Sequence, residues 1–154
     1  MINVIKADLH RADHAAGVVQ CIDAYAADPL GASAPLSEEA KAGLIPGLLA
    51  TPSCTVLIAL LNGQIVGTAV TFLGFSTFMA KPRLNLHDLI VLKPYRGHGV
   101  GRKLIQAVTD LAVELGCGAV TLELRQDNGR ARRLYRSMGF GDWLTPMEFW
   151  QKKL

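Results

Sequence analysis

A glycine-rich turn between an apolar run and an amphipathic run constrains this chain more than any other stretch. Residues 86–92 are apolar and β-branched enough for a buried strand, which Pro94 ends. From Val100 onward, apolar residues recur at helical spacing, and three glycines stand between positions 97 and 101, where this helix would begin. The stretch therefore predicts a strand, a tight turn and a helix in succession.

The predicted turn has the properties of an anion site. The start of a helix carries unpaired backbone N–H groups and about half a positive charge. Glycine has no Cβ, so an anion can approach the backbone closely. Arg96 precedes the glycines, and Arg102 and Lys103 follow them with further positive charge. The turn is predicted to seat a phosphate or a pyrophosphate.

The spacing of the glycines excludes two common phosphate loops. A P-loop needs Gly-Lys followed by Ser or Thr, whereas Gly101 is followed by Arg102 and Lys103. A dinucleotide fingerprint that started at Gly97 would need a glycine at position 102, which is arginine. The pattern that remains is Arg-x-x-Gly-x-Gly over residues 96–101, directly after a strand.

A second motif lies downstream of this turn. Residues 120–125 are typical of another strand, and the pattern Asn-x-x-Ala-x-x-Leu-Tyr-x-x-x-Gly-Phe then runs from Asn128 to Phe140. In this order and at this distance, the two motifs resemble the acyl-CoA loop and the second signature of the GNAT family of N-acetyltransferases. The resemblance covers residues 55–140 well and the two ends of the chain only in outline.

The first half of the chain predicts a short strand over residues 2–6 and then two helices. The first helix has an apolar stripe, a cap at Asp8 or a nearby residue, and an end before Asp28. Ser37 and the acidic residues after it indicate the second helix start, and Pro46 with the following glycine is expected to break that helix early.

Three further strands are predicted from hydrophobic runs. An Asn-Gly pair at 62–63 separates the apolar runs 54–61 and 64–75, which is the strongest local signal for a hairpin with a primed turn. The strand before the glycine turn is expected over 84–92, and residues 143–151 are expected to close the chain as a last strand.

This order of elements is the one the family resemblance implies for a single domain over residues 1–154. The expected fold is α/β (α+β), with a mixed, largely antiparallel sheet of six to seven strands and helices on both faces. The resemblance further implies that the strands containing Val91 and Leu122 splay apart and that the acyl-CoA arm lies between them. The chain length suits one hydrophobic core.

The resemblance implies acetyl-CoA as co-substrate, held largely by backbone N–H groups. Those of residues 89–91 would bond the acyl and pantetheine carbonyls, those of the glycine turn the pyrophosphate, and Asn128 the cofactor arm. The expected cofactor-binding residues are Leu89, Ile90, Val91, Arg96, Gly97, His98, Gly99, Val100, Gly101, Arg102, Asn128, Ala131 and Tyr135.

Tyr135 matches the position at which many family members carry a general acid. A phenol titrates near 10, so it would reprotonate the leaving thiolate without needing a perturbed pKa. The alternative is that Tyr135 only packs its helix against a strand.

Two carboxylates are candidates for the base that takes the amine proton. Glu123 matches the glutamate of protein N-terminal acetyltransferases, and Asp88 matches an acidic position of polyamine and related small-amine acetyltransferases. A carboxylate with a pKa near 4.3 faces a gap of about six units, roughly 8 kcal/mol, against an ammonium near 10.4. A water relay, a desolvated carboxylate or a neutral amine would reduce that cost, and the sequence leaves these alternatives open.

The acceptor is expected to be a small cationic amine. The sequences at 75–78 and 86–89 resemble the diamine and polyamine branch, and His87 is a candidate for the pocket lining. Acidic and aromatic residues in the variable parts of the chain would suit a cation. They are Asp23, Tyr25, Asp28, Glu38, Glu39, Phe78, Trp143 and Glu148.

Composition limits the other classes of function. The net charge is only +3, and the arginines between 130 and 136 serve a phosphorylated cofactor as well as they would a nucleic acid, so no nucleic-acid partner is expected. No apolar run approaches the length of a membrane span and the N-terminus does not resemble a signal peptide, which predicts a cytoplasmic protein with no membrane partner. A homodimer is possible through an exposed last strand.

Metal sites and disulfides are not expected. The three cysteines are widely spaced and lack a C-x-x-C pair. His10 and His14 share a helical face but have no third ligand at suitable spacing, so a solvated face is the expected role.

Two alternatives to a small-amine acetyltransferase remain. The same motifs would serve a protein or peptide acetyltransferase acting on N-termini or lysines. A non-catalytic acyl-CoA sensor would keep residues 96–101 and Asn128 but could lose the acid and the bases. The presence of Tyr135, Glu123 and Asp88 favours an enzyme.

Overall fold

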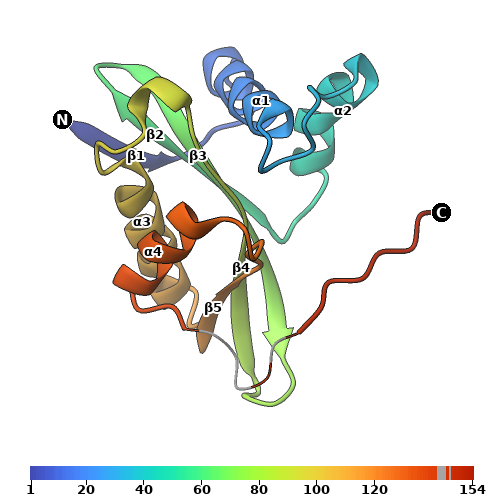
Figure 1. Cartoon of the computed structure of the whole chain (residues 1–154), viewed down its shortest axis with the longest axis vertical. Coiled ribbons are helices and arrows are strands. Elements are labelled where there is room, and N and C mark those ends of the chain that lie inside the picture. The colour runs from blue at the N-terminus through green and yellow to red at the C-terminus, as the bar shows by residue number, and fades with distance from the viewer. Residues whose placement is uncertain (142–144, 146) are drawn as a thin grey trace.

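The computed structural model describes residues 1–141, 145 and 147–154 (Figure 1). In chain order the elements are β1 (Ile2–Lys6), α1 (Ala12–Ala27), α2 (Glu38–Leu49), β2 (Cys54–Leu61), β3 (Gln64–Ser76), β4 (Lys81–Val91), the 3-10 turn η1 (Lys93–Tyr95), α3 (Val100–Glu114), β5 (Ala119–Leu122) and α4 (Gly129–Ser137).

The five strands form one sheet in the order β1-β2-β3-β4-β5. The first four pair antiparallel to their neighbours, and β5 pairs parallel to β4. The mixed, largely antiparallel sheet is therefore confirmed, although the described residues form five strands rather than six to seven.

The expected last strand is absent from the part of its range that the structure describes. Residues 142–144 and 146 lie outside the described residues, and 147–154 form no strand. Figure 1 shows this tail running away from the sheet. Met147, Phe149 and Trp150 are all exposed, so the tail lacks the buried face that stabilises a strand within one chain.

Helices cover both faces of the sheet, as expected. On one face α3 buries Leu104, Ile105 and Val108 against the strands, with α4 packed beside them. On the other face Val18 of α1 packs on β2 and β3, and α2 adds partly buried side chains such as Ile45. The two clusters thus pack the sheet between helices on both faces.

The hairpin prediction is confirmed in detail. Asn62 and Gly63 join β2 to β3 with φ values of 52° and 81°, both in the left-handed region that a primed two-residue turn needs. This geometry is set locally, which explains why the sequence alone predicts it.

Two helix predictions were wrong at their ends. Helix α1 begins at Ala12, later than expected, because Asp8 forms a turn of its own before the helix. The Asp8 carboxylate accepts from the His10 N–H, and the Asp8 N–H donates to His14 Nδ1, each at 3.0 Å. His14 is consequently buried, not solvated. Ser37 does cap α2, but the helix continues through Pro46 to Leu49, since a proline so near the end removes only one hydrogen bond.

The splay between β4 and β5 is confirmed by their pairing. The two strands pair only from Arg83 with Ala119 to Leu86 with Leu122, while β4 runs on to Val91. Strand β5 also ends at Leu122, so the rest of the predicted strand 120–125 leaves the sheet. On the other side of β4 the register shifts by one residue at His87. This bulge redirects the strand at the point where the two strands part.

Candidate active site

A cavity of about 650 Å³ lies where β4 and β5 part. Its walls come from the end of α1, the second half of β4, the glycine turn, the segment after β5, and α4. Of the thirteen expected cofactor-binding residues, all but His98 line it. All three catalytic candidates, Asp88, Glu123 and Tyr135, line it as well.

The glycine turn has the geometry of an anion seat. Gly97 and Gly99 have φ values of 86° and 83°, and Gly99 is the N-cap of the 15-residue helix α3. The first helical amide that bonds back is that of Lys103, which donates to Gly99 O at 3.1 Å. A Cβ on Gly99 would meet no atom within 4 Å, so the space above the turn is open to a phosphate.

Gly101 has a different role in the same motif. A Cβ there would stand 3.0 Å from Leu134 Cδ2, so this glycine lets α3 approach α4 closely. The motif therefore combines two roles, an anion seat and a contact between helices. The spacing of the glycines does not show which glycine has which role.

The positive charge of Arg96, which was expected at the anion site, forms an ion pair with Asp28. Its Nε donates to Val91 O at 2.9 Å, and its Nη2 lies 3.0 Å from Asp28 Oδ2. Asp28 neutralises it, and the Leu30 N–H together with Arg96 holds the pKa of the Asp28 carboxyl below its usual range. Arg96 thus joins the glycine turn to the end of α1.

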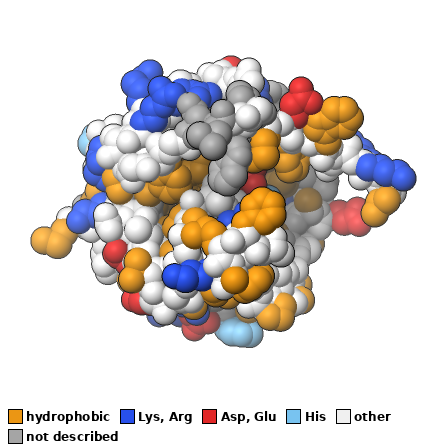
Figure 2. Space-filling model, turned by 90° about the horizontal axis from the view of Figure 1, so that it is seen from below, with side chains coloured by type: hydrophobic (Ala, Val, Ile, Leu, Met, Phe, Trp, Pro, Cys, Tyr) orange, Lys and Arg blue, Asp and Glu red, His pale blue; other side chains and the backbone are white. Residues whose placement is uncertain are grey.

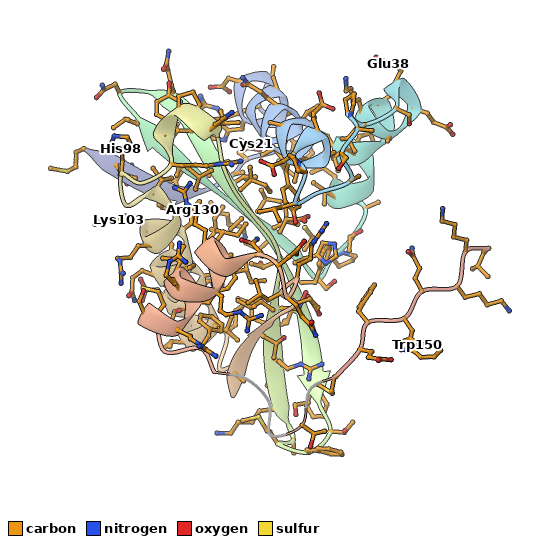
Figure 3. The ribbon with its side chains drawn as sticks, in the orientation of Figure 1. Cys21, Glu38, His98, Lys103, Arg130 and Trp150 are labelled. Carbon is orange, nitrogen blue, oxygen red and sulfur yellow. The ribbon has the colours of Figure 1, made fainter. Side chains whose placement is uncertain are left out.

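Another arginine comes near the glycine turn. Arg130 Nη2 lies 4.0 Å from the position of a Cβ on Gly97. This agrees with the sequence analysis, in which the arginines between 130 and 136 could serve a phosphorylated cofactor. Figure 3 shows Arg130, His98 and Lys103 on the side of the molecule where α3 begins.

Arg102 and Asn128 both bind parts of α4. Arg102 donates to Ser137 Oγ at 2.9 Å. Asn128 caps the helix, its Oδ1 accepting from the Ala131 N–H at 3.1 Å. Because the cap uses the side-chain oxygen of Asn128, the side-chain NH2 group remains for a ligand. This group can only donate hydrogen bonds.

The three candidate acid and base groups have different surroundings. Burial raises the pKa of Asp88, against a smaller opposing effect of His87. Burial, with the charges of Tyr25 and Asp88, raises the pKa of Tyr135 to about 12. The unperturbed phenol expected from the sequence is therefore wrong, because Tyr135 lies partly buried beside a carboxylate. Glu123 is exposed, and both of its carboxylate oxygens accept from Asn85 Nδ2 at 3.3 Å.

Three of the residues expected at the acceptor pocket, Tyr25, Asp28 and His87, line the cavity. Asp23 instead accepts from the Leu36 N–H at 2.8 Å, and Trp143 lies outside the described residues. The remaining four bind elsewhere or face solvent: Glu38, Glu39, Phe78 and Glu148.

Phe149 lines the cavity and was not predicted. It belongs to the exposed tail, and exposed hydrophobic side chains are spread over the face seen in Figure 2. Its position depends on tertiary placement of the tail, for which the sequence carries no local signal.

The described part of the chain has neither a metal-binding cluster nor a membrane-spanning helix. Within residues 1–141, 145 and 147–154, no cluster of three or more His, Cys, Asp or Glu side chains is arranged to hold a metal ion. No helix among the same residues is both long and apolar enough to span a membrane.

Sequence comparison finds relatives among N-acetyltransferases. The chain is 35% identical over 86 residues to a thialysine N-epsilon-acetyltransferase of Bos taurus, which covers 56% of this chain and 49% of the relative. It is 40% identical over 76 residues to the N-alpha-acetyltransferase RimI of Mycobacterium tuberculosis, covering 48% of this chain and 46% of the relative. The chain thus spans about half the length of these curated relatives.

Comparison with solved structures and with protein families gives a consistent result. An aminoglycoside acetyltransferase from an uncultured soil metagenomic sample superposes with a TM-score of 0.78 over 98% of this chain and 97% of its own, at 20% identity, which shows a shared fold. The sequence profile of the acetyltransferase (GNAT) family matches residues 19–140. With the splayed strands and the glycine turn in place, the chain belongs to the GNAT acetyltransferase family.

Proposed function

We propose that this protein transfers the acetyl group of acetyl-CoA to the primary amine of a small cationic acceptor, by direct attack in a ternary complex. One observation carries the proposal. A single cavity has the glycine turn at one end and holds Asp88 and Tyr135, two groups with perturbed pKa values, in its wall. Perturbed groups inside a cleft are typical of catalytic sites.

The residues of the cavity fit acetyl-CoA, which would supply the activated acyl thioester. The open space at Gly99 and the free N–H groups at the start of α3 suit a pyrophosphate. Strand β4 has no β5 partner beyond Leu86, so its edge at residues 89–91 is available to the acyl and pantetheine carbonyls. The Asn128 amide would donate to the arm.

Asp88 suits the role of base better than Glu123. Burial raises the pKa of Asp88 and so narrows the gap of about six units between an ordinary carboxylate and an ammonium. Glu123 is exposed and bonded to Asn85, which suits orientation of the amine or of a relaying water. We therefore assign proton removal to Asp88.

Tyr135 would donate to the leaving sulfur. Its pKa of about 12 keeps the phenol protonated at neutral pH, the form a donor needs. A thiol titrates near 8.5, so complete transfer from the resting phenol is uphill by about 3.5 units, roughly 5 kcal/mol. Once Asp88 has taken a proton and lost its charge, its effect on Tyr135 disappears and this gap narrows. Removal of the amine proton is thus expected to assist donation to the thiolate.

The charges of the cavity support a cationic acceptor. Asp88 and Glu123 lie in its wall, while Arg96 is paired with Asp28 and Arg125 with Asp127. The other two arginines of the wall lie toward the proposed cofactor seat, where Arg130 approaches Gly97 and Arg102 bonds Ser137 of α4. The thialysine and aminoglycoside enzymes among the similar proteins are named for amine substrates, which agrees with this choice. A cytoplasmic location and a homodimer are part of the same proposal, the latter supported by the exposed Phe149 and Trp150.

The direct test is release of free CoA thiol from acetyl-CoA across a panel of diamines, polyamines, amino acids, aminoglycosides and peptide N-termini. Turnover with the small amines is the expected result. Turnover with peptides alone would mean that the acceptor is a peptide N-terminus and not a small amine. This is the next candidate, because one relative is the N-alpha-acetyltransferase RimI. Acetyl-CoA binding without turnover on any amine would indicate a sensor.

Gly99→Ala is expected to weaken acetyl-CoA binding by about tenfold. An alanine there takes a left-handed conformation and places a Cβ in the space left for the phosphate, which costs on the order of 1 kcal/mol or more. Isothermal titration with acetyl-CoA measures the change.

Gly116→Ala is the matched control for this variant. Gly116 follows the other end of α3, has a φ of 67°, and a Cβ on it would also meet no atom within 4 Å. Both variants should lose similar stability, but only Gly99→Ala should lose affinity. Equal affinities for the two variants would remove Gly99 from the cofactor site.

A further inference from the structure

The connection between α1 and α2 forms one wall of the cavity without being a helix or a strand. Asp28 and Leu30 line the cavity from this segment, residues 28–37. Within the segment, the Leu30 N–H donates to Asp28 Oδ1 at 3.0 Å and the Gly31 N–H to Asp28 O at 2.8 Å. The segment is also tied to α1, because the N–H groups of Ala32 and Ala34 both donate to Ala26 O, at 2.9 and 3.2 Å. The Leu36 N–H donates to Asp23 Oδ1 at 2.8 Å. The wall is therefore anchored to α1, and the side chains of Arg96 and Arg125 add contacts from other elements.

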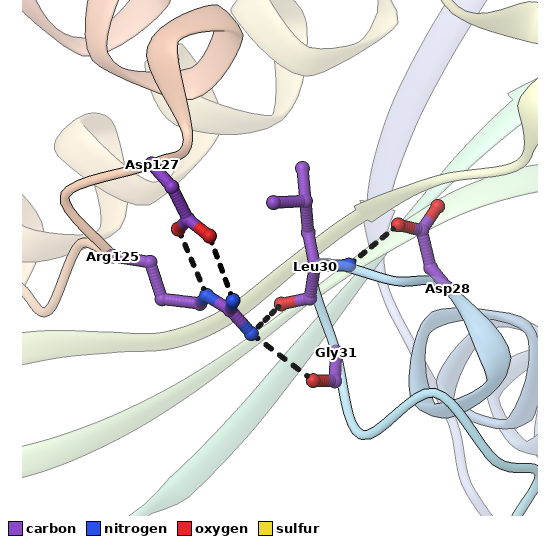
Figure 4. A network of polar contacts seen from close by, with 5 residues as sticks. All are labelled: Asp28, Leu30, Gly31, Arg125 and Asp127. Carbon is purple, nitrogen blue, oxygen red and sulfur yellow. Dashed lines mark hydrogen bonds and ion pairs between the residues drawn. The ribbon is translucent and has the colours of Figure 1, made fainter.

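Arg125 reaches this wall from the segment after β5. Its Nη1 donates to Leu30 O at 3.4 Å and to Gly31 O at 3.3 Å. Its Nε and Nη2 donate to the two carboxylate oxygens of Asp127 at 3.0 and 2.8 Å (Figure 4). Asp127 thus fixes the orientation of the guanidinium through two hydrogen bonds, and Nη1 is directed at the carbonyl oxygens of Leu30 and Gly31.

Gly31 connects this contact to the reacting groups. A Cβ on Gly31 would overlap Tyr25 O, so the segment folds back directly over the last turns of α1. Tyr25 lines the cavity, and burial together with the charge of Asp88 raises the pKa of its hydroxyl. A shift of Gly31 would therefore shift Tyr25 as well, and with it the space beside Asp88.

The Arg11–Asp13 pair serves as a comparison for the Arg125–Asp127 pair. Arg11 and Asp13 form the same two-bond fork, at 3.1 and 2.7 Å, with side chains 58% and 63% exposed. For Arg125 and Asp127 the exposures are 50% and 61%. Exposed pairs of this kind contribute little to stability. The two pairs differ in two respects: Arg125 lines the cavity, and it also bonds a second segment, 95 residues away along the chain.

We propose that Arg125 is a positioning residue for the acceptor. By fixing Leu30 and Gly31 it holds the α1–α2 wall in place, which sets both the affinity for the amine and the size of amine admitted. The inference rests on the proposed function, since the wall encloses the acceptor only if the amine binds beside Asp88. Because Asp127 and the two carbonyls occupy the guanidinium, Arg125 does not bind a substrate carboxylate.

Arg125→Gln tests this, with Arg11→Gln as the matched control. For Arg125→Gln we expect KM for a small diamine to rise about tenfold, with kcat and the Kd of acetyl-CoA changed by less than about twofold. KM for a larger aminoglycoside should rise less. Arg125→Lys should recover only part of the loss, because an ammonium keeps the charge but not the fork. Arg11→Gln should match the unchanged protein in every constant.

Hydrogen exchange gives a measurement that needs no substrate. The amides of Leu30, Gly31 and Leu36 should exchange about tenfold faster in Arg125→Gln and at the original rate in Arg11→Gln. A higher KM with unchanged exchange would mean that Arg125 contacts the amine directly, and faster exchange with unchanged KM would mean that the wall does not shape the pocket. Either result overturns the proposal. If the unaltered protein turns over no amine, the proposed function fails, while unchanged exchange would separately remove Arg125 from the wall.

Discussion

Tyr135→Phe should lower kcat by about 100-fold while the Kd of acetyl-CoA stays within about twofold. The substitution removes only the hydroxyl, because the phenylalanine ring can keep the contact with Phe140, at a centroid distance of 5.8 Å. A positioned general acid typically contributes a factor of this size, equivalent to about 2.7 kcal/mol. Steady-state kinetics and isothermal titration separate the two constants.

Tyr95→Phe is the control for the loss of a hydroxyl. Tyr95 also borders the cavity, but its hydroxyl donates to Gln64 Oε1 at 3.3 Å, away from the reacting groups. Its kcat should remain near that of the unaltered protein. A loss of less than tenfold in Tyr135→Phe would exclude the phenol as the acid and leave only its packing role.

Asp88→Asn should lower kcat/KM at neutral pH by about 100-fold. Without a base, the amine must arrive neutral, so the remaining activity should rise about tenfold per pH unit until the pKa of the free amine is reached. The pH profile of kcat/KM measures this. Glu123→Gln is the matched variant on the other carboxylate, and it should keep the original profile. If instead Glu123→Gln shows the large loss and the steep pH dependence while Asp88→Asn keeps the original profile, the base is Glu123.

The same substitution should stabilise the fold at neutral pH. Burial raises the pKa of Asp88 above its unfolded value, so the folded state binds this proton more tightly than the unfolded state does. Ionising Asp88 therefore costs stability as the pH rises through the folded pKa, and the cost is fully present above it. Below the unfolded value, near 3.8, the carboxyl is protonated in both states and the cost is absent.

Urea unfolding at two pH values checks this sign. Asp88→Asn should be more stable than the unaltered protein at pH 7, and the difference should shrink toward the acid limit. A variant that is both more stable and less active would show that this partly buried carboxylate is kept for function. Equal stabilities at pH 7 would show that Asp88 is not desolvated in the folded protein.

The features that the sequence determined are those set by short-range geometry. The Asn62-Gly63 turn needs two left-handed residues, and the glycine turn at 97–101 needs open backbone at a helix start. Both follow from adjacent residue types. The two motifs also place Asp88 and Tyr135 in one site, because the order of elements brings their strand and helix together.

Other features were decided only by tertiary structure. The pairing of Arg96 with Asp28 joins residues 68 apart, and the contact of Arg125 with Leu30 joins residues 95 apart. No spacing rule predicts such contacts, because they depend on how the α1–α2 segment packs across the sheet. The raised pKa of Tyr135 has the same origin, since burial beside Tyr25 and Asp88 exists only in the folded chain. The sequence thus determined the glycine turn and the candidate acid and bases, and the fold decided their surroundings, the direction of their pKa shifts and the wall that we propose encloses the acceptor.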